Sequence, residues 1–224
     1  MAPSFEGVAR EWLGWARTPG HDAYWQYRDA FFALLPEPAG RVLDVGCGEG
    51  RVTRDLRERG YDVTGLDVAP TLIAAARERD PGGAYVEAAA EALPFGDASF
   101  ALVVAYNSLM DVDDLPAAVA EAARVLAPGG RLCACVTHPT ADASRLGGVY
   151  LREAAFEIPD ERDGLTMTWI GRHRPLEAYS RALEAAGLAI EALREPPPAP
   201  TAPAHYDEWR DRPMFLLLRA QHAQ

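Results

Sequence analysis

Residues 42–51, which read VLDVGCGEGR, constrain the fold of this chain more than any other stretch. An apolar run with an acid at Asp44 is followed by three glycines at alternate positions, Gly46, Gly48 and Gly50. This pattern predicts a buried parallel strand that ends in a tight turn and leads into a helix. Because glycine readily adopts positive φ and lets a ligand approach the backbone, we expect a nucleotide-like ligand across the turn.

The spacing of the glycines indicates which ligand to expect. A dinucleotide-binding turn has the pattern G-x-G-x-x-G, but here the third of those positions is Arg51. A carboxylate at Asp44 would repel a pyrophosphate and suits a cationic or amino-bearing ligand. The string D-x-G-x-G-x-G resembles that of the class I S-adenosylmethionine (SAM) dependent methyltransferases, specifically their small-molecule, type 11-like branch.

The resemblance extends over residues 41–193 and implies that SAM is the cofactor. In that family the turn, here Gly46 and Gly48, passes under the methionine part of SAM. Asp44 is expected either to bind backbone amides of the turn or to contact the ligand ammonium, directly or through water. The residues alone do not decide between these two roles.

Composition narrows the class of protein. The chain has 224 residues, of which 49% are hydrophobic, and its net charge is −11. An acidic surface disfavours binding to phosphate backbones. We find no secretory signal, no bilayer-spanning stretch and no metal-ligand spacing among Cys47, Cys133 and Cys135, which we interpret as reduced thiols. We therefore expect a cytoplasmic enzyme, monomeric or homodimeric, acting on a small molecule and not on nucleic acid or a membrane.

Strand-like and helix-like stretches alternate along the chain. Right-handed crossovers turn such an alternation into a doubly wound α/β sheet. The family resemblance implies a Rossmann-like sheet of seven strands whose last strand is antiparallel and lies between its neighbours. We expect strands over 42–45, 61–66, 84–88, 100–105, 131–137, 188–193 and 213–219, and helices over 49–59, 70–80, 114–126 and 175–187.

The domain organisation is expected to be simple. We predict one methyltransferase domain over 1–224, with an N-terminal helical lid over 1–38 rich in aromatic residues. The segment 138–173 interrupts the alternation of strands and helices, and we interpret it as a cap inserted over the ligand cleft. There is no internal repeat and no sign of a second domain.

Ligands of doubly wound sheets bind outside the carboxyl ends of the strands. Asp67 closes the second strand, where a carboxylate can accept hydrogen bonds from both ribose hydroxyls, as it does in the family; Val68 follows it. The alternative role for Asp67 is to cap the helix that begins at Pro70.

Residues 88–95, AAAEALPF, resemble the adenine-binding stretch of the family. That resemblance implies that the backbone at Ala90 and Glu91 meets ring nitrogens and that Leu93 packs on the adenine face. The acid that the family usually has two residues before Glu91 is Ala89 here, which removes one contact. Glu91 could instead be a solvated surface acid.

Residues for catalysis are expected after the fourth and fifth strands. Asn107 could bind the acceptor, or satisfy a local turn, and Tyr106 could stack or hydrogen-bond near the sulfonium. His138 could accept a proton from a hydroxyl or amine, or be a loop histidine bound to backbone. Tyr24 and Arg28, one helical turn apart, are candidates to reach the methionine carboxylate or the substrate.

The expected activity is methyl transfer from SAM to an oxygen or nitrogen of a small-molecule acceptor. A SAM-binding enzyme that catalyses a rearrangement or cyclisation without methylation is an alternative, as is a non-catalytic SAM-binding protein. A nicotinamide oxidoreductase is disfavoured because the chain lacks G-x-G-x-x-G at this turn. A nucleic-acid methyltransferase is disfavoured by the negative charge and by the absence of an N-P-P-Y-type sequence after the fourth strand.

Overall fold

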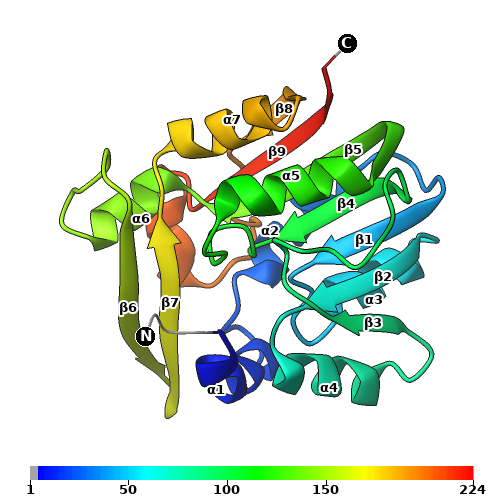
Figure 1. Cartoon of the computed structure of the whole chain (residues 1–224). Coiled ribbons are helices and arrows are strands. Elements are labelled where there is room, and N and C mark those ends of the chain that lie inside the picture. Colours follow the sequence, from blue (N-terminus) through cyan, green and yellow to red (C-terminus); the bar gives the residue numbers. More distant parts are fainter. Residues whose placement is uncertain (1–4, 224) are drawn as a thin grey trace.

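The structure, a computed structural model, describes residues 5–223 and has a seven-stranded sheet at its centre (Figure 1). The strands lie in the order β3-β2-β1-β4-β5-β9-β8. Pairs from β3 to β5 are parallel, whereas β9 is antiparallel to β5 and to β8, which confirms the expected fold. The strands are β1 (Arg41–Val45), β2 (Asp62–Asp67), β3 (Ala84–Glu87), β4 (Phe100–Tyr106), β5 (Leu126–Thr137), β8 (Leu188–Arg194) and β9 (Phe215–His222).

Helices cover both faces of this sheet. One apolar core lies between the sheet and helices α2 (Tyr24–Phe32) and α3 (Arg51–Glu58). The other lies between the opposite face of the sheet and helices α5 (Leu115–Val125) and α7 (Leu176–Ala185). α4 (Pro70–Arg79) packs along β2 and β3. The remaining helices are α1 (Phe5–Arg17), α6 (Pro139–Arg145) and the 3-10 helix η1 (Ala204–Trp209).

Alternation along the central strands decides which side chains meet which helices. On β4, Val104 and Tyr106 face α2 and α3, whereas Val103 faces α5 and α7. Side chains two residues apart on a strand share a face, so Asp44 of β1 shares the face of Val42, toward α3. Both inner faces are apolar, as expected for a parallel sheet that helices cover on each side.

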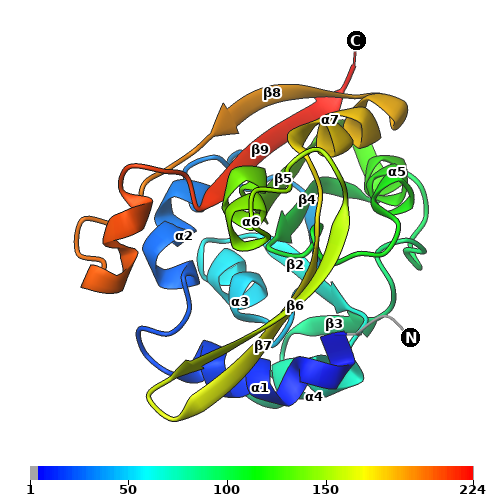
Figure 2. The ribbon, with the colours of Figure 1, turned by 90° about the vertical axis from the view of Figure 1, so that its left-hand side faces the viewer.

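A second, two-stranded sheet forms most of the segment expected to be a cap. β6 (Ala154–Arg162) and β7 (Leu165–His173) are antiparallel, joined by Asp163 and Gly164, whose φ values are 52° and 77°. Asp-Gly favours this two-residue turn with both residues at positive φ. The hairpin crosses in front of the carboxyl ends of the central strands (Figure 2). The sequence interpretation proposed a cap over 138–173 and did not predict these strands.

Between residues 5 and 223, no helix combines the length and the apolar character that crossing a membrane requires.

Candidate active site

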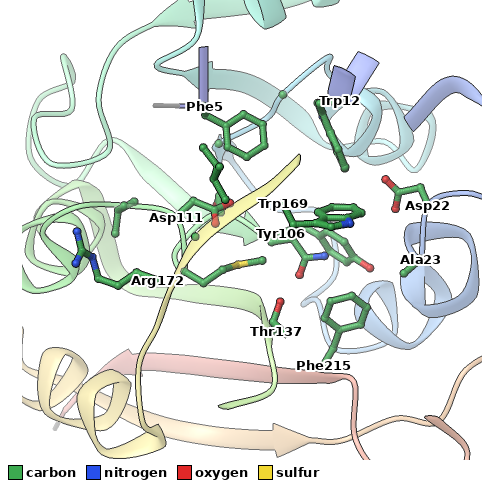
Figure 3. Close-up of a pocket in the computed structure, with 18 of the residues that line it drawn as sticks. Phe5, Trp12, Asp22, Ala23, Tyr106, Asp111, Thr137, Trp169, Arg172 and Phe215 are labelled. Atoms are coloured by element: carbon green, nitrogen blue, oxygen red, sulfur yellow. The ribbon is translucent and has the colours of Figure 1, made fainter. Parts of the chain in front are cut away.

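A cavity of about 1000 Å³ opens at the carboxyl ends of β1, β2 and β4. Its floor is the loops that follow these strands, and its roof comes from α1, the β6–β7 hairpin and η1 (Figure 3). Aromatic side chains from distant parts of the chain line it, including Trp12, Tyr106, Trp169, Trp209 and Phe215. This is the edge of the sheet at which doubly wound proteins bind their ligands.

The glycine turn forms one wall of the cavity. Gly46 and Cys47 both donate backbone hydrogen bonds to the carbonyl of Leu66, at 2.7 and 2.9 Å, which ties the turn to β2. Gly46 has a φ of 72°, and a Cβ there would lie 2.2 Å from the Cβ of Ser108. Only glycine fits this close approach between the ends of β1 and β4, so the spacing in the sequence reflects a steric requirement.

Asp44 is buried beneath the turn and is bound by a helix rather than by the turn itself. The hydroxyl of Thr53 in α3 donates to its Oδ2 at 2.7 Å, while its Oδ1 has no hydrogen-bond partner among the described residues. Burial, reinforced by the nearby Asp67, raises the pKa of Asp44 to about 7. The role of binding turn amides is therefore not the one seen, and because Asp44 is buried and does not line the cavity, the expected direct contact with a ligand amine is not seen either.

Asp67 is held by backbone amides at the end of β2. The N–H of Gly48 donates to its Oδ2 and the N–H of Ala69 to its Oδ1, both at 2.8 Å. Burial raises its pKa, and the hydrogen bonds act in the opposite direction. A carboxylate oxygen can accept more than one hydrogen bond, so both oxygens remain available to hydroxyl groups in the cavity, which Asp67 and Val68 line.

The stretch after β3 only partly faces the cavity. Ala90 and Glu91 line it, and Glu91 Oε1 accepts from the backbone N–H groups of Asp113 and Asp114 at 3.2 and 3.4 Å. Leu93 does not line the cavity, because it packs into the apolar core on the side of α5. We therefore revise the expectation that Leu93 covers an adenine ring.

The loop after β4 brings Tyr106 and Asn107 to the cavity, as expected. Asn107 has a φ of 52°, donates its N–H to the carbonyl of Cys135 and accepts from the Cys135 thiol at 3.1 Å. Tyr106 is buried edge-on against Tyr24 and Phe31, and its hydroxyl has no partner among the described residues. Asn107 is thus partly satisfied by β5, while the hydroxyl of Tyr106 is buried and not exposed to the cavity.

Tyr24 and Arg28 do not line the cavity. Both bind Asp55 of α3, the Tyr24 hydroxyl at 2.5 Å and Arg28 Nη1 at 3.2 Å. The cation beside the glycine turn is instead Arg51, whose Nη2 lies 2.8 Å from Asp22 Oδ2. Its guanidinium lies between the rings of Trp12 and Tyr24, 5.0 and 4.6 Å from their centroids. The spacing of Tyr24 and Arg28 is helical, but this face of α2 meets α3.

His138 also has a different environment from the one expected of a base. Its Nδ1 accepts from the backbone N–H of Thr140 at 3.2 Å, so it caps α6, and its Nε2 lies 2.9 Å from Glu195 Oε1. The side chain does not line the cavity, and burial lowers the pKa of the imidazole. We therefore revise its assignment from catalysis to helix capping.

Two features of the site were missed in the sequence. Asp111 lines the cavity four residues after Asn107, in a loop whose local pattern marks no acid over another. The hairpin supplies Trp169 and Phe156, and it could have been found from the Asp163-Gly164 dipeptide between two alternating stretches.

The fold and site together define an α/β protein with a large cavity beside its glycine turn, at the carboxyl ends of the parallel strands. Residues 43–134 match the methyltransferase domain family. A SAM-dependent methyltransferase structure from Mesorhizobium loti superimposes with a TM-score of 0.68 and 30% identity, over 89% of this chain and 97% of that one. The chain belongs to the SAM-dependent methyltransferases.

Curated relatives agree on the family and differ in the molecule they methylate. A demethylmenaquinone methyltransferase from Beutenbergia cavernae is 35% identical over 68% of this chain. A malonyl-[acyl-carrier protein] O-methyltransferase from Enterobacter lignolyticus is 42% identical over 46% of it. The matches span 65% and 42% of the length of these two relatives, less than two thirds in each case.

The residues at the turn fit the family's cofactor. Gly46 and Gly48 line the cavity, and the carboxylate of Asp67 has acceptor capacity left for a ribose. Asp44 lies behind the turn and is not among the residues that line the cavity, so the structure does not bring its free Oδ1 within direct reach of a ligand ammonium.

Proposed function

We propose that this protein transfers the methyl group of SAM to an oxygen or nitrogen atom of a small-molecule acceptor. One observation carries the proposal: the glycine turn after β1 and the carboxylate that closes β2 line the same cavity, which continues beyond them under an aromatic roof. The turn and the carboxylate suit the two ends of a sulfonium nucleoside, and the remaining space suits a second molecule.

In this proposal the cofactor lies along the ends of three strands. Gly46 and Gly48 pass under its methionine part, Asp67 accepts from its ribose, and the backbone at Ala90 and Glu91 meets its adenine. Val68 borders the adenine side of the cavity. Arg51 takes the place first proposed for Arg28 beside the methionine carboxylate, because it is the arginine that lines the cavity at the turn.

SAM supplies a methyl group on a sulfonium, which is already an activated leaving group. The protein then has to align the acceptor, exclude water and accept a proton. Trp12 and Trp169 of the roof pack edge to face, with ring centroids 6.1 Å apart, and cover the turn from outside. Tyr106 and Asn107 lie on the floor, where they are proposed to contact the reacting groups.

The acceptor is proposed to be a small molecule because the net charge of −11 disfavours nucleic acid. According to their names, the two curated relatives described above methylate demethylmenaquinone and malonyl-[acyl-carrier protein]. Their acceptors differ, so the relatives support the reaction more than any one acceptor. A monomer or a homodimer is proposed for the assembly.

The first experiment measures SAM binding by calorimetry and then incubates the protein with SAM and a panel of small hydroxyl and amine compounds. Formation of S-adenosylhomocysteine with a methylated product supports methyl transfer. Binding with a product that carries no new methyl group would support the rearrangement or cyclisation alternative. Failure to bind SAM at all would refute the proposal.

A further inference from the structure

Nearly all carboxylates that line the cavity are bound by donors of the protein itself. Backbone N–H groups bind Asp67, Glu91 and Asp114. Arginine or indole groups bind Asp22, Glu49, Asp113, Asp160 and Glu208. Within residues 5–223, Asp111 is the exception, since no N–H or O–H group donates to its side chain. A carboxylate left in this state in a cavity wall has acceptor atoms for water or for a donor on a ligand.

The position of Asp111 is defined by the backbone on both sides of it. Its own N–H binds the carbonyl of Ser108 at 2.9 Å, and the N–H of Arg172 in β7 binds the carbonyl of Met110 at 3.2 Å. A Cβ on Gly171 would lie 3.0 Å from Asp111 Oδ1. The carboxylate therefore lies between the loop after β4 and the hairpin, in the wall of the cavity that Tyr106 also lines (Figure 3).

The charges around Asp111 leave it without a counter-ion. Arg174 donates to the carbonyls of Met110 and Val112 at 3.1 and 2.6 Å, and Arg172 binds Asp113 at 3.2 Å. Burial raises the pKa of Asp111 well above its usual range; Asp142 and Asp67 act in the same direction, and Arg174 opposes them. A carboxylate with a raised pKa is a stronger base than an ordinary one.

We propose that Asp111 accepts the proton of the methyl acceptor, and that this acceptor presents a hydroxyl or a neutral amine on an apolar body. The inference rests on the methyl-transfer function proposed above. The apolar body follows from the cavity wall near Asp111, where Phe156, Trp169 and Met110 supply apolar surface. The hydroxyl or amine follows from the vacant acceptor atoms of Asp111, which need a donor that the protein does not supply.

The proton balance is simple. The lone pair of the acceptor oxygen or nitrogen forms the new bond to the methyl carbon, and the electrons of the carbon–sulfur bond leave with the sulfur. The proton on that oxygen or nitrogen moves to the carboxylate of Asp111, which becomes neutral. Release of this proton to solvent after the product leaves restores the starting state.

The test compares Asp111→Asn with a matched control, Asp62→Asn. Asp62 is exposed at the start of β2, at the end of the sheet opposite the cavity. Its carboxylate makes no hydrogen bond or ion pair with another described residue. Both variants are first checked for SAM binding by calorimetry, which also reports that the fold is intact. Transfer of a labelled methyl group is then measured with 4-butylphenol, 1-octanol, 4-butylaniline and octylamine across a range of pH.

We expect Asp111→Asn to bind SAM as the wild type does and to lose about 10²–10⁴-fold in kcat/KM, the usual contribution of a general base. In the wild type, kcat should rise with pH as Asp111 ionises, and this rise should disappear in the variant. Asp62→Asn should match the wild type. Carbon-13 NMR of the aspartate carboxyls, with S-adenosylhomocysteine bound, should show one resonance with a raised pKa that Asp111→Asn lacks.

Three results would overturn this inference, and each can be distinguished from a failure of the methyl-transfer proposal. Undiminished methylation by Asp111→Asn would show that Asp111 is not the base. Normal SAM binding with no methylation of any compound in the panel would remove the acceptor class. An Asp111 resonance that titrates as an ordinary carboxyl would show that Asp111 is not the base, whichever acceptor the protein uses. Loss of SAM binding by the wild type would instead refute the function on which the inference rests.

Discussion

At the residue scale, two buried acids on neighbouring strands have different hydrogen-bond partners. Asp67 is bound by amides of the turn and of the segment before α4, whereas Asp44 is bound by a hydroxyl of α3. The difference follows from position, since Asp67 ends its strand and Asp44 lies inside one, facing a helix. Asp67 is therefore the carboxylate that a bound ribose can reach from the cavity.

Replacing Asp67 with alanine should weaken SAM binding by roughly 1.5–3 kcal/mol, the range for a hydrogen bond to a charged group. That corresponds to a loss of about 10–150-fold in Kd, measurable by calorimetry. Asp62→Ala, at the other end of the same strand, is the control and should bind normally. Equal affinities in the two variants would remove Asp67 from the site.

Gly46→Ala tests the turn itself. At Gly46 a Cβ meets Ser108 at 2.2 Å and also needs a positive φ, whereas Gly60 has a φ of 89° and open space around it. Gly60→Ala should therefore lose about 1–2 kcal/mol of stability from backbone strain alone. Gly46→Ala should lose roughly 1–3 kcal/mol more, because it also overpacks the junction of β1 and β4. Denaturant unfolding measures both, and equal losses would contradict the steric argument.

At the element scale, α1 closes the cofactor end of the cavity by bridging two parts of the molecule. Glu6 of α1 accepts from Thr71 of α4, and Glu11 accepts from the N–H of Thr168 in β7. Trp12 Nε1 lies 3.5 Å from the place a Cβ would occupy on Gly48. α1 and the hairpin thus form the roof together, while α2 belongs to the core beneath it. The division of the chain into lid and cap remains an interpretation.

Removal of the Trp12 ring should open this roof. We expect Trp12→Ala to weaken SAM binding by about 0.5–1.5 kcal/mol, the contribution of one aromatic packing partner. Trp25→Ala is the control, because Trp25 is 46% exposed on α2 and does not line the cavity. Calorimetry measures the SAM affinity of both variants. A larger loss of affinity from Trp25→Ala than from Trp12→Ala would contradict the role given to α1.

At the scale of the whole molecule, buried acids couple folding to pH. Burial raises the pKa of Asp44 to about 7 and that of Asp142 to about 6. In the unfolded chain both groups lose their protons near pH 4, so the folded state binds more protons between about pH 4 and 7. Stability should therefore fall as the pH rises through this window, because deprotonation creates negative charges in buried surroundings.

The cofactor-free protein should accordingly have a higher Tm near pH 5 than near pH 8. Asp44→Asn should show a smaller drop over the same interval, since an amide does not titrate and can still accept from Thr53. Thermal unfolding of both proteins across the range measures the effect. Parallel curves for the two proteins would show that Asp44 does not carry this pH dependence.

The expectations that held depend on local rules. The glycine turn, the strand endings at Asp67 and Tyr106 and the helix that Asp114 caps were all recognisable from neighbouring residues. The expectations that failed concern the direction of a side chain. Helical spacing put Tyr24 and Arg28 on one face of α2, but only packing shows that this face meets Asp55.

The sequence by itself determined the order of the seven central strands and of the helices between them, and the glycine turn after the first strand, because backbone conformation and burial follow short patterns of residues. Tertiary structure alone decided that Arg51 and not Arg28 lines the cavity, that His138 caps a helix, and that no described residue donates to the Asp111 side chain. These outcomes depend on contacts between segments far apart in the chain. No local pattern predicts which of two acids or two arginines will form a hydrogen bond or an ion pair when such segments pack together.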